Sequence, residues 1–205
     1  MARLRRVPPG RAGRLWLQHR LAVAERAVTL LDQKLRVLHA ETERRAAVAA
    51  GTGRAWAEAS AEAAVWLERA ALLGGERAVR LAGGGPPVDV VLSWTWTMGV
   101  RHPDGSTCSF PSDPDELPAA NTPVVLARAA HRRALEAAAQ HAAAQAALLL
   151  LQAEERATRR RVRALEDRWL PVLRNARRER ELALEEQEHA DWIRLRWILD
   201  RPRNR

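Results

Sequence analysis

The sequence has one cysteine, one phenylalanine, no tyrosine and a single lysine among its 205 residues. Because Cys108 is alone, the chain can form neither an internal disulfide nor a cysteine-ligated zinc site. The β-branched and aromatic residues that favour strands are also scarce outside one short stretch. These absences exclude a disulfide scaffold and a zinc module, and a reducing, cytoplasmic location is expected.

Long apolar runs are lacking as well. The most apolar stretch, 134–151, contains Glu136, Gln140, His141 and Gln145, which a membrane-spanning helix of about 20 residues would hardly tolerate. We therefore expect no direct insertion into a membrane. Residues 1–10 are interpreted as a basic tail and not as a targeting sequence, because consecutive prolines and a glycine interrupt any early amphipathic helix.

Alanine and leucine, which favour helix, dominate what is present. Seven of the eleven prolines fall between Pro86 and Pro123, directly after three consecutive glycines. This composition break divides the rest of the chain into a helix over 11–82, a Gly/Pro-rich insert over 83–119, and a second helix with a basic tail over 120–205.

The first helical segment follows the alternating four-residue and three-residue steps of a coiled-coil seam. All but three of the seam positions are apolar: Leu17, Leu21, Ala24, Val28, Leu31, Leu35, Leu38, Thr42, Arg45, Ala49, Thr52, Trp56, Ala59, Ala63, Trp66, Ala70 and Leu73. The phase never slips. The pattern predicts a long helix that buries one narrow face.

In the last segment the same steps run from Ala130 through Val162, Trp169 and Val172 to Trp197. Pro171 removes an interior hydrogen bond and is expected to bend this helix. Two such helices can bury their seams by folding back on each other. The predicted fold is therefore mainly α, a long antiparallel two-helix coiled coil with a small β-hairpin insert between the helices.

The insert carries the strand signal. Apolar residues alternate from Val88 to Trp96, which predicts a half-buried strand with Trp94 and Trp96 on its inner face. Pro103, Asp104 and Gly105 supply the chemistry of a turn, and 106–110 is expected to return as a short second strand.

Motifs for catalysis and cofactor binding are missing. Lys34, the only lysine, follows Gln33, so no phosphate-binding Walker loop exists. No two histidines are spaced as metal ligands on one helical face. His102, Asp104 and Ser106 suggest a catalytic triad, but in a tight turn these side chains would not point at one another. We predict a protein that is not an enzyme and has no cofactor or metal.

Basic residues outnumber acidic ones by 34 to 25. The excess gathers near both ends of the chain, which an antiparallel hairpin would bring together. A solvated basic face, a surface for an acidic protein partner, and a nucleic-acid footprint all fit this distribution. Since the arginines alternate with glutamates, nucleic-acid binding is the least favoured of the three.

Three stretches resemble the D subunit of the V-type and archaeal A-type rotary ATPases, the central rotor shaft. The first joins Val7-Pro8 to Leu30-Leu31 and Lys34, and the second is Gly99 to Pro103. The third runs from Arg160-Arg161-Val162-Arg163 through Glu166 to Leu170-Pro171, with Trp192 to Arg196 beyond it. Pro9 and Arg163 depart from the family pattern, which usually has Thr and Asn there.

The resemblance implies a shaft without catalytic residues in an ATP-driven or ATP-synthesising complex peripheral to the membrane. Its termini would insert into the head of A and B subunits, the F subunit would clasp the coiled coil, and the C (or d) socket protein would hold the opposite end. The residues expected to contact partners are Arg3, Arg5, Arg6, Lys34, Gly99, Pro103, Arg160, Arg161, Arg163, Glu166 and Pro171. The alternative is a basic coiled-coil scaffold that binds nucleic acid or an acidic partner.

Overall fold

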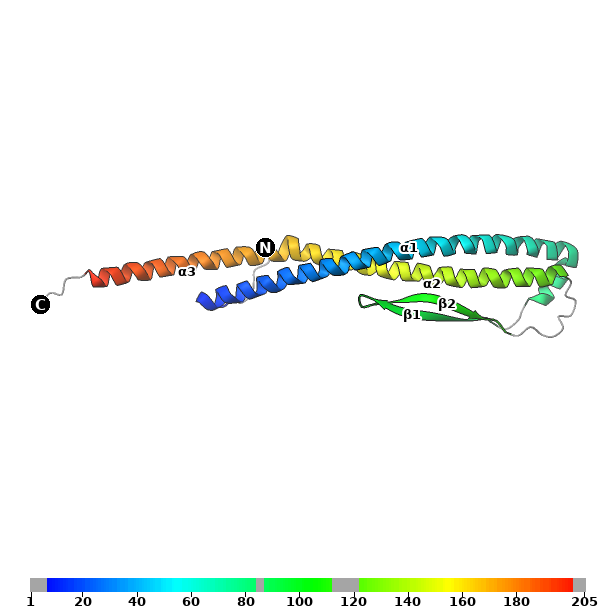
Figure 1. Ribbon diagram of the computed structural model, residues 1–205, viewed down its shortest axis with the longest axis horizontal. Helices are drawn as coiled ribbons and strands as arrows, with labels where there is room; N and C mark the ends of the chain where they lie inside the picture. Colours follow the sequence, from blue (N-terminus) through cyan, green and yellow to red (C-terminus); the bar gives the residue numbers. More distant parts are fainter. Residues whose placement is uncertain (1–6, 84–86, 112–121, 201–205) are drawn as a thin grey trace. The chain divides into compact units, whose positions relative to one another are not determined.

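The computed structural model describes residues 7–83, 87–111 and 122–200. In chain order the elements are α1 (Gly10–Ala82), β1 (Asp89–Thr97), β2 (Val100–Ser109), α2 (Thr122–Ala164), the π-helical turn η1 (Leu165–Trp169) and α3 (Leu170–Leu199) (Figure 1). The predicted fold class is confirmed: two long helices pack together, and an antiparallel β-hairpin lies between them in the sequence. Across the described residues, no helix is both long and apolar enough to cross a membrane.

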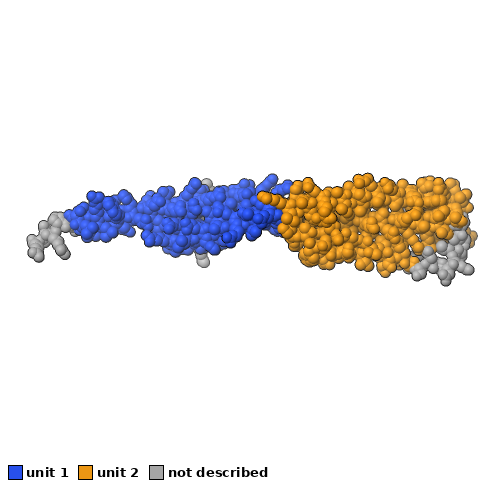
Figure 2. Space-filling model, in the orientation of Figure 1, with its two compact units in different colours: residues 1–35, 157–205 blue, residues 36–156 orange. Residues whose placement is uncertain are grey.

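The chain divides into two compact units, residues 1–35 with 157–205 and residues 36–156 (Figure 2). The helical segments within each unit run antiparallel. In the first unit Arg11 pairs with Glu188 and Glu25 with Arg174, so residue numbers rise on one helix as they fall on the other. In the second unit Glu62 pairs with Arg133 in the same sense.

Burial along α1 follows the predicted seam. Every buried side chain of α1 is at a predicted position, among them Leu17, Leu21, Leu38 and Ala63. Two predicted positions are wrong: Trp56 is 43% exposed and Leu73 is 73% exposed. Leu73 lies just before a kink, because Gly75 adopts φ 75° and ψ 159°, which interrupts the helix. This conformation is open to glycine and costly for other residues.

Every predicted seam position of the second helix up to Val162 is buried or half-buried, and beyond it Leu165 and Ala176 still pack against the core. The buried residues beyond it are Leu170, Leu173 and Leu184, whereas the predicted Trp169 is 38% exposed. The cause is η1, where the Leu170 N–H donates to the Leu165 carbonyl. A π turn holds one residue more than an α turn. It therefore advances the seam by one position, which a fixed heptad count cannot anticipate.

The π turn ends at Trp169, two residues before Pro171, which takes an early position in α3. A proline inside an α-helix clashes with the carbonyl four residues earlier and lacks the N–H to bond it. A widened turn just before the ring relieves both problems. The sequence predicted a disturbance at Pro171, and in the structure this disturbance is a π turn.

The hairpin differs from the predicted one in its turn. The two-residue turn is Met98-Gly99, both with positive φ (50° and 83°), as the tight turns of β-hairpins require. Pro103 lies inside β2, where the strand pairing shifts between Ser93 and Trp94. Such a bulge tolerates a residue with no N–H to donate. The expected turn at 103–105 is therefore wrong, whereas the expected returning strand is confirmed over 106–109 and begins earlier, at Val100.

Candidate partner-binding surfaces

Within residues 7–83, 87–111 and 122–200, no three His, Cys, Asp or Glu side chains come close enough together to hold a metal ion. His102 and Asp104 lie on strand β2 and use their polar atoms elsewhere. The His102 Nδ1–H donates to the Pro103 carbonyl at 3.1 Å, Nε2 lies 2.9 Å from the Thr97 hydroxyl, and Asp104 pairs with Arg45. The polar atoms of His102 and Asp104 therefore bond within the hairpin and to α1, and not to each other.

The basic residues predicted near the ends of the chain are exposed where they are described. Arg160, Arg161 and Arg163 lie in the last turns of α2, and Glu166 is exposed in η1. Arg3, Arg5 and Arg6 fall outside the described residues. Lys34 is half-buried one turn beyond Leu31, which packs in the same apolar cluster as Val162. The first unit therefore brings Lys34 and the α2 arginines to one neighbourhood.

The end of α3 extends beyond the start of α1. The Arg11–Glu188 contact of 2.8 Å lies at the start of α1, and every residue after Leu184 is exposed up to the end of α3. Figure 1 shows α3 continuing past the beginning of α1. Large apolar side chains follow on all sides of this segment: Trp192, Ile193, Leu195, Trp197, Ile198 and Leu199. The sequence seam had placed Ile193 and Trp197 against a partner helix, and within this chain they are exposed.

The hairpin is attached to α1 by a buried arginine. Arg45 is 7% exposed, and its guanidinium donates to Glu41 at 2.8 Å and to Asp104 of β2 at 2.6 Å. The hydrogen bond from Arg44 lowers the pKa of Glu41 to about 2; burial opposes this effect, and the bond from Arg45 reinforces it. The same Glu41–Arg44 bond raises the arginine pKa. The Arg45–Asp104 ion pair therefore holds β2 beside α1, and Glu41 positions the Arg45 guanidinium for it.

The apolar face of the hairpin is exposed. Trp94 is 47% exposed and Trp96 is 67% exposed, with the Arg101 guanidinium 4.5 Å from the centre of the Trp94 ring. His102, whose cross-strand partner is Thr95, is fully buried. The prediction that Trp94 and Trp96 lie on the inner face is therefore wrong. The opposite face of the hairpin, which carries His102, is the more buried one. Gly99 is exposed at the tip, and Pro103 is buried.

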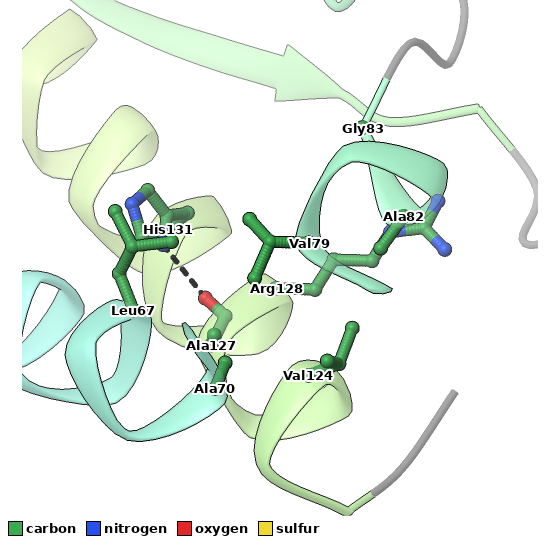
Figure 3. Close-up of a pocket in the computed structure, with 9 residues that line it drawn as sticks. All are labelled: Leu67, Ala70, Val79, Ala82, Gly83, Val124, Ala127, Arg128 and His131. Atoms are coloured by element: carbon green, nitrogen blue, oxygen red, sulfur yellow. Dashed lines mark hydrogen bonds between the residues drawn. The ribbon is translucent and has the colours of Figure 1, made fainter. Parts of the chain in front are cut away.

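A pocket of about 230 Å³ lies in the second unit, at the end where α1 finishes and α2 begins. Figure 3 shows its apolar walls converging from three segments: Leu67 and Ala70 before the Gly75 kink, Val79 and Ala82 after it, and Val124 and Ala127 of α2. Arg128 and His131 add polar groups, and the His131 ring donates to the Ala127 carbonyl at 2.8 Å. Sequence reasoning missed this pocket, because only the kink brings 79–82 back over α2.

Comparison with known proteins gives one clear match. A family model described as the D subunit of ATP synthase matches residues 15–200. No curated protein matches the chain. The matched span takes in the hairpin, the π turn and all but the first few residues of the helices; Arg3, Arg5 and Arg6 lie outside it.

Proposed function

Since the chain belongs to the D-subunit family of ATP synthases, we propose that it is the rotor shaft of a V/A-type rotary ATPase and transmits rotation between the A/B head and the membrane ring. The D subunit is a non-catalytic component of the central stalk in these complexes.

The observation that carries the proposal is the exposed end of α3. Contiguous apolar surface of this kind marks an interaction site. The segment after Glu188 exposes tryptophan, isoleucine and leucine side chains on all sides of the helix. A binding site that surrounds the helix would cover them better than one flat partner surface. Insertion into the centre of the A/B head would bury all sides at once.

We assign the remaining partners from family membership and from the other exposed surfaces, which are the helix pair, the end with the pocket and the hairpin. The F subunit would clasp the helix pair, and the C (or d) socket protein would take the end that carries the pocket. The exposed Trp94 and Trp96 of the hairpin would regulate turnover through the head or the F subunit. The whole chain would work at the cytoplasmic face of the membrane without entering it.

The experiment tests the α3 end in the assembled complex. Ile193→Gln combined with Ile198→Gln removes apolar surface beyond Glu188, where the chain itself makes no core. We expect ATP hydrolysis coupled to ion pumping to fall about tenfold, because each buried aliphatic side chain contributes about 1.5–3 kcal/mol. Thermal unfolding of the isolated chain should not change.

The matched control is Leu182→Gln, since Leu182 is 60% exposed on the part of α3 that runs beside α1. Parent-like coupling in the double variant would contradict insertion of this end. Failure of the parent chain to co-purify with the A, B and F subunits, together with salt-sensitive binding to duplex DNA, would instead favour the basic scaffold.

A further inference from the structure

The face of the hairpin that carries His102 is covered, although the sheet has only two strands. His102 is fully buried, and Thr95 and Thr97 of β1 beside it are half-buried. A two-stranded sheet is a single layer and cannot enclose a side chain by itself. Another part of the chain must supply the cover, and the contact of Asp104 with Arg45 shows that α1 lies beside this face.

Asp104 owes this contact to a β-bulge. Ser93 pairs with Gly105 and Trp94 pairs with Pro103, so Asp104 is an extra residue without a cross-strand partner. A bulge turns a side chain away from the direction that regular pleating would give it. Among the residues that the structure describes, the contact of 2.6 Å between Asp104 and Arg45 is the one hydrogen bond or ion pair that joins the strands to a helix.

Arg45 has a partner whether or not the hairpin is in contact with α1. Its side chain is 7% exposed and donates to Glu41 of its own helix as well as to Asp104. A buried charge without any partner is strongly destabilising, but Glu41 remains when Asp104 moves away. The Asp104 side chain is 55% exposed, so water reaches its carboxylate easily. The contact can therefore break without leaving a buried charge unpaired.

The polar groups of the hairpin are also satisfied without the helix. Both ring nitrogens of His102 bond inside the hairpin, to the Thr97 hydroxyl at 2.9 Å and to the Pro103 carbonyl at 3.1 Å. The base of the hairpin has a separate attachment, because the Arg132 guanidinium of α2 lies 5.3 Å from the centre of the Phe110 ring, directly after β2. Movement of the strands away from α1 therefore breaks no hydrogen bond of His102 and leaves the base attached.

We infer that the hairpin is a hinged arm, attached at its base through Phe110 and Arg132 and held closed against α1 by the Arg45–Asp104 ion pair. Opening breaks this pair, exposes the face that carries His102 and leaves Arg45 bonded to Glu41. The closed arm presents only its tryptophan face to other molecules, whereas the open arm presents both faces. The arm is a property of the chain itself and does not depend on the proposed function.

The experiment measures how fast His102 reacts in the purified full chain. Diethyl pyrocarbonate modifies accessible imidazole nitrogens, and mass spectrometry distinguishes His102 from His19, an exposed histidine of α1 that serves as the internal reference. Asp104→Asn keeps the size of the side chain and removes its charge. We expect this variant to speed the modification of His102 about tenfold, because loss of the ion pair raises the population of the open arm.

The matched control is Asp89→Asn, which removes the same charge from an exposed position at the start of β1 and should leave the rate at the parent value. Asp104→Glu retains a carboxylate and should stay within about threefold of the parent. High salt should speed the reaction of His102 in the parent and have little effect in Asp104→Asn, since ions can screen only a pair that is present.

Hydrogen exchange followed by mass spectrometry separates an opened arm from an unfolded one. The cross-strand amides of β1 and β2 should remain protected in Asp104→Asn. Equal rates of His102 modification in the parent and in Asp104→Asn would overturn the inference. Loss of amide protection in Asp104→Asn would overturn it as well, because the strands would then separate instead of moving together as an arm.

Discussion

Arg45 occupies a seam position of α1 that an apolar residue would ordinarily fill. Its guanidinium is satisfied on two sides, by Glu41 of its own helix and by Asp104 of the hairpin. A buried charge is tolerated only when it is paired and hydrogen-bonded. The sequence reveals Arg45 as an exception to the pattern, but it cannot reveal that the partner lies 59 residues away, because that pairing depends on where the hairpin lies.

Glu41 makes this cluster sensitive to pH. Folding lowers its pKa from 4.5 to about 2, so its ionised form stabilises the folded chain fully above pH 4.5. That stabilisation is lost as the pH falls toward 2. We predict that the parent's thermal midpoint drops more steeply between about pH 5 and pH 2 than that of Glu41→Gln, measured by circular dichroism.

At about pH 7 the same substitution should cost about 1 kcal/mol, because the carboxylate receives charge-assisted hydrogen bonds at a partly solvated site. Glu43→Gln is the control, since Glu43 is an exposed acid two residues further along the helix. Identical slopes for the parent and Glu41→Gln in the acid range would show that Glu41 does not titrate as the structure implies.

At the scale of elements, the sequence predicted α1 more accurately than the second helix. Large apolar residues such as Leu17 and Leu38 fix a single register for α1. In the second helix the alanine block at 134–147 fits nearly any register, and η1 then adds one residue to the seam. A heptad pattern can be read from neighbouring residues in the sequence. The π turn cannot, because it arises where Pro171 disturbs the helix while Leu170 and Leu173 must still reach the core.

The hairpin shows the same limit. Its strands follow from the alternation in 88–96, but two sets of turn residues competed, and Gly99 outweighed the Pro103 to Gly105 stretch. Positive φ at two successive residues is needed for the tight turn, and both Met98-Gly99 and Asp104-Gly105 offer a glycine for it, so local turn chemistry does not choose between them. The sequence alone does not show which face of the hairpin is buried, because that depends on the contact between Asp104 and Arg45 of α1.

Deletion of Glu166 tests whether the π turn is needed to accommodate Pro171. Removing one residue would let η1 close as an α turn, and Leu170, Leu173 and Leu184 would then keep facing α1 at the heptad positions that continue from Val162. We predict a loss of about 3 kcal/mol in the free energy of unfolding, since the Pro171 ring would then clash with the carbonyl four residues earlier in a regular α turn. Urea unfolding followed by tryptophan fluorescence measures the change.

The paired control is Glu166→Ala, which keeps the residue count and changes an exposed side chain. Its unfolding midpoint should match that of the parent. A deletion variant as stable as the parent would mean that a regular α turn accommodates Pro171 equally well and that the π turn does not relieve it.

At the scale of the molecule, the net charge of +9 attracts acidic partners wherever the arginines lie, so charge alone does not locate a binding surface. Reversing Arg160 and Arg161 to glutamate changes the charge by −4, from +9 to +5. Reversing Arg36 and Arg54, also exposed on helices, changes it equally. The two double variants have the same net charge and differ only in where it has changed.

We predict that Arg160→Glu with Arg161→Glu lowers coupled ATP hydrolysis of the assembled complex about tenfold, because reversal places like charges against acidic loops of the head. The Arg36→Glu, Arg54→Glu chain should stay within about twofold of the parent. Helix content by circular dichroism should be unchanged in both. If both variants lose the same coupled activity, total charge is the determinant and Arg160 and Arg161 are not assigned to the head. If neither variant loses activity, these arginines have no role in coupling.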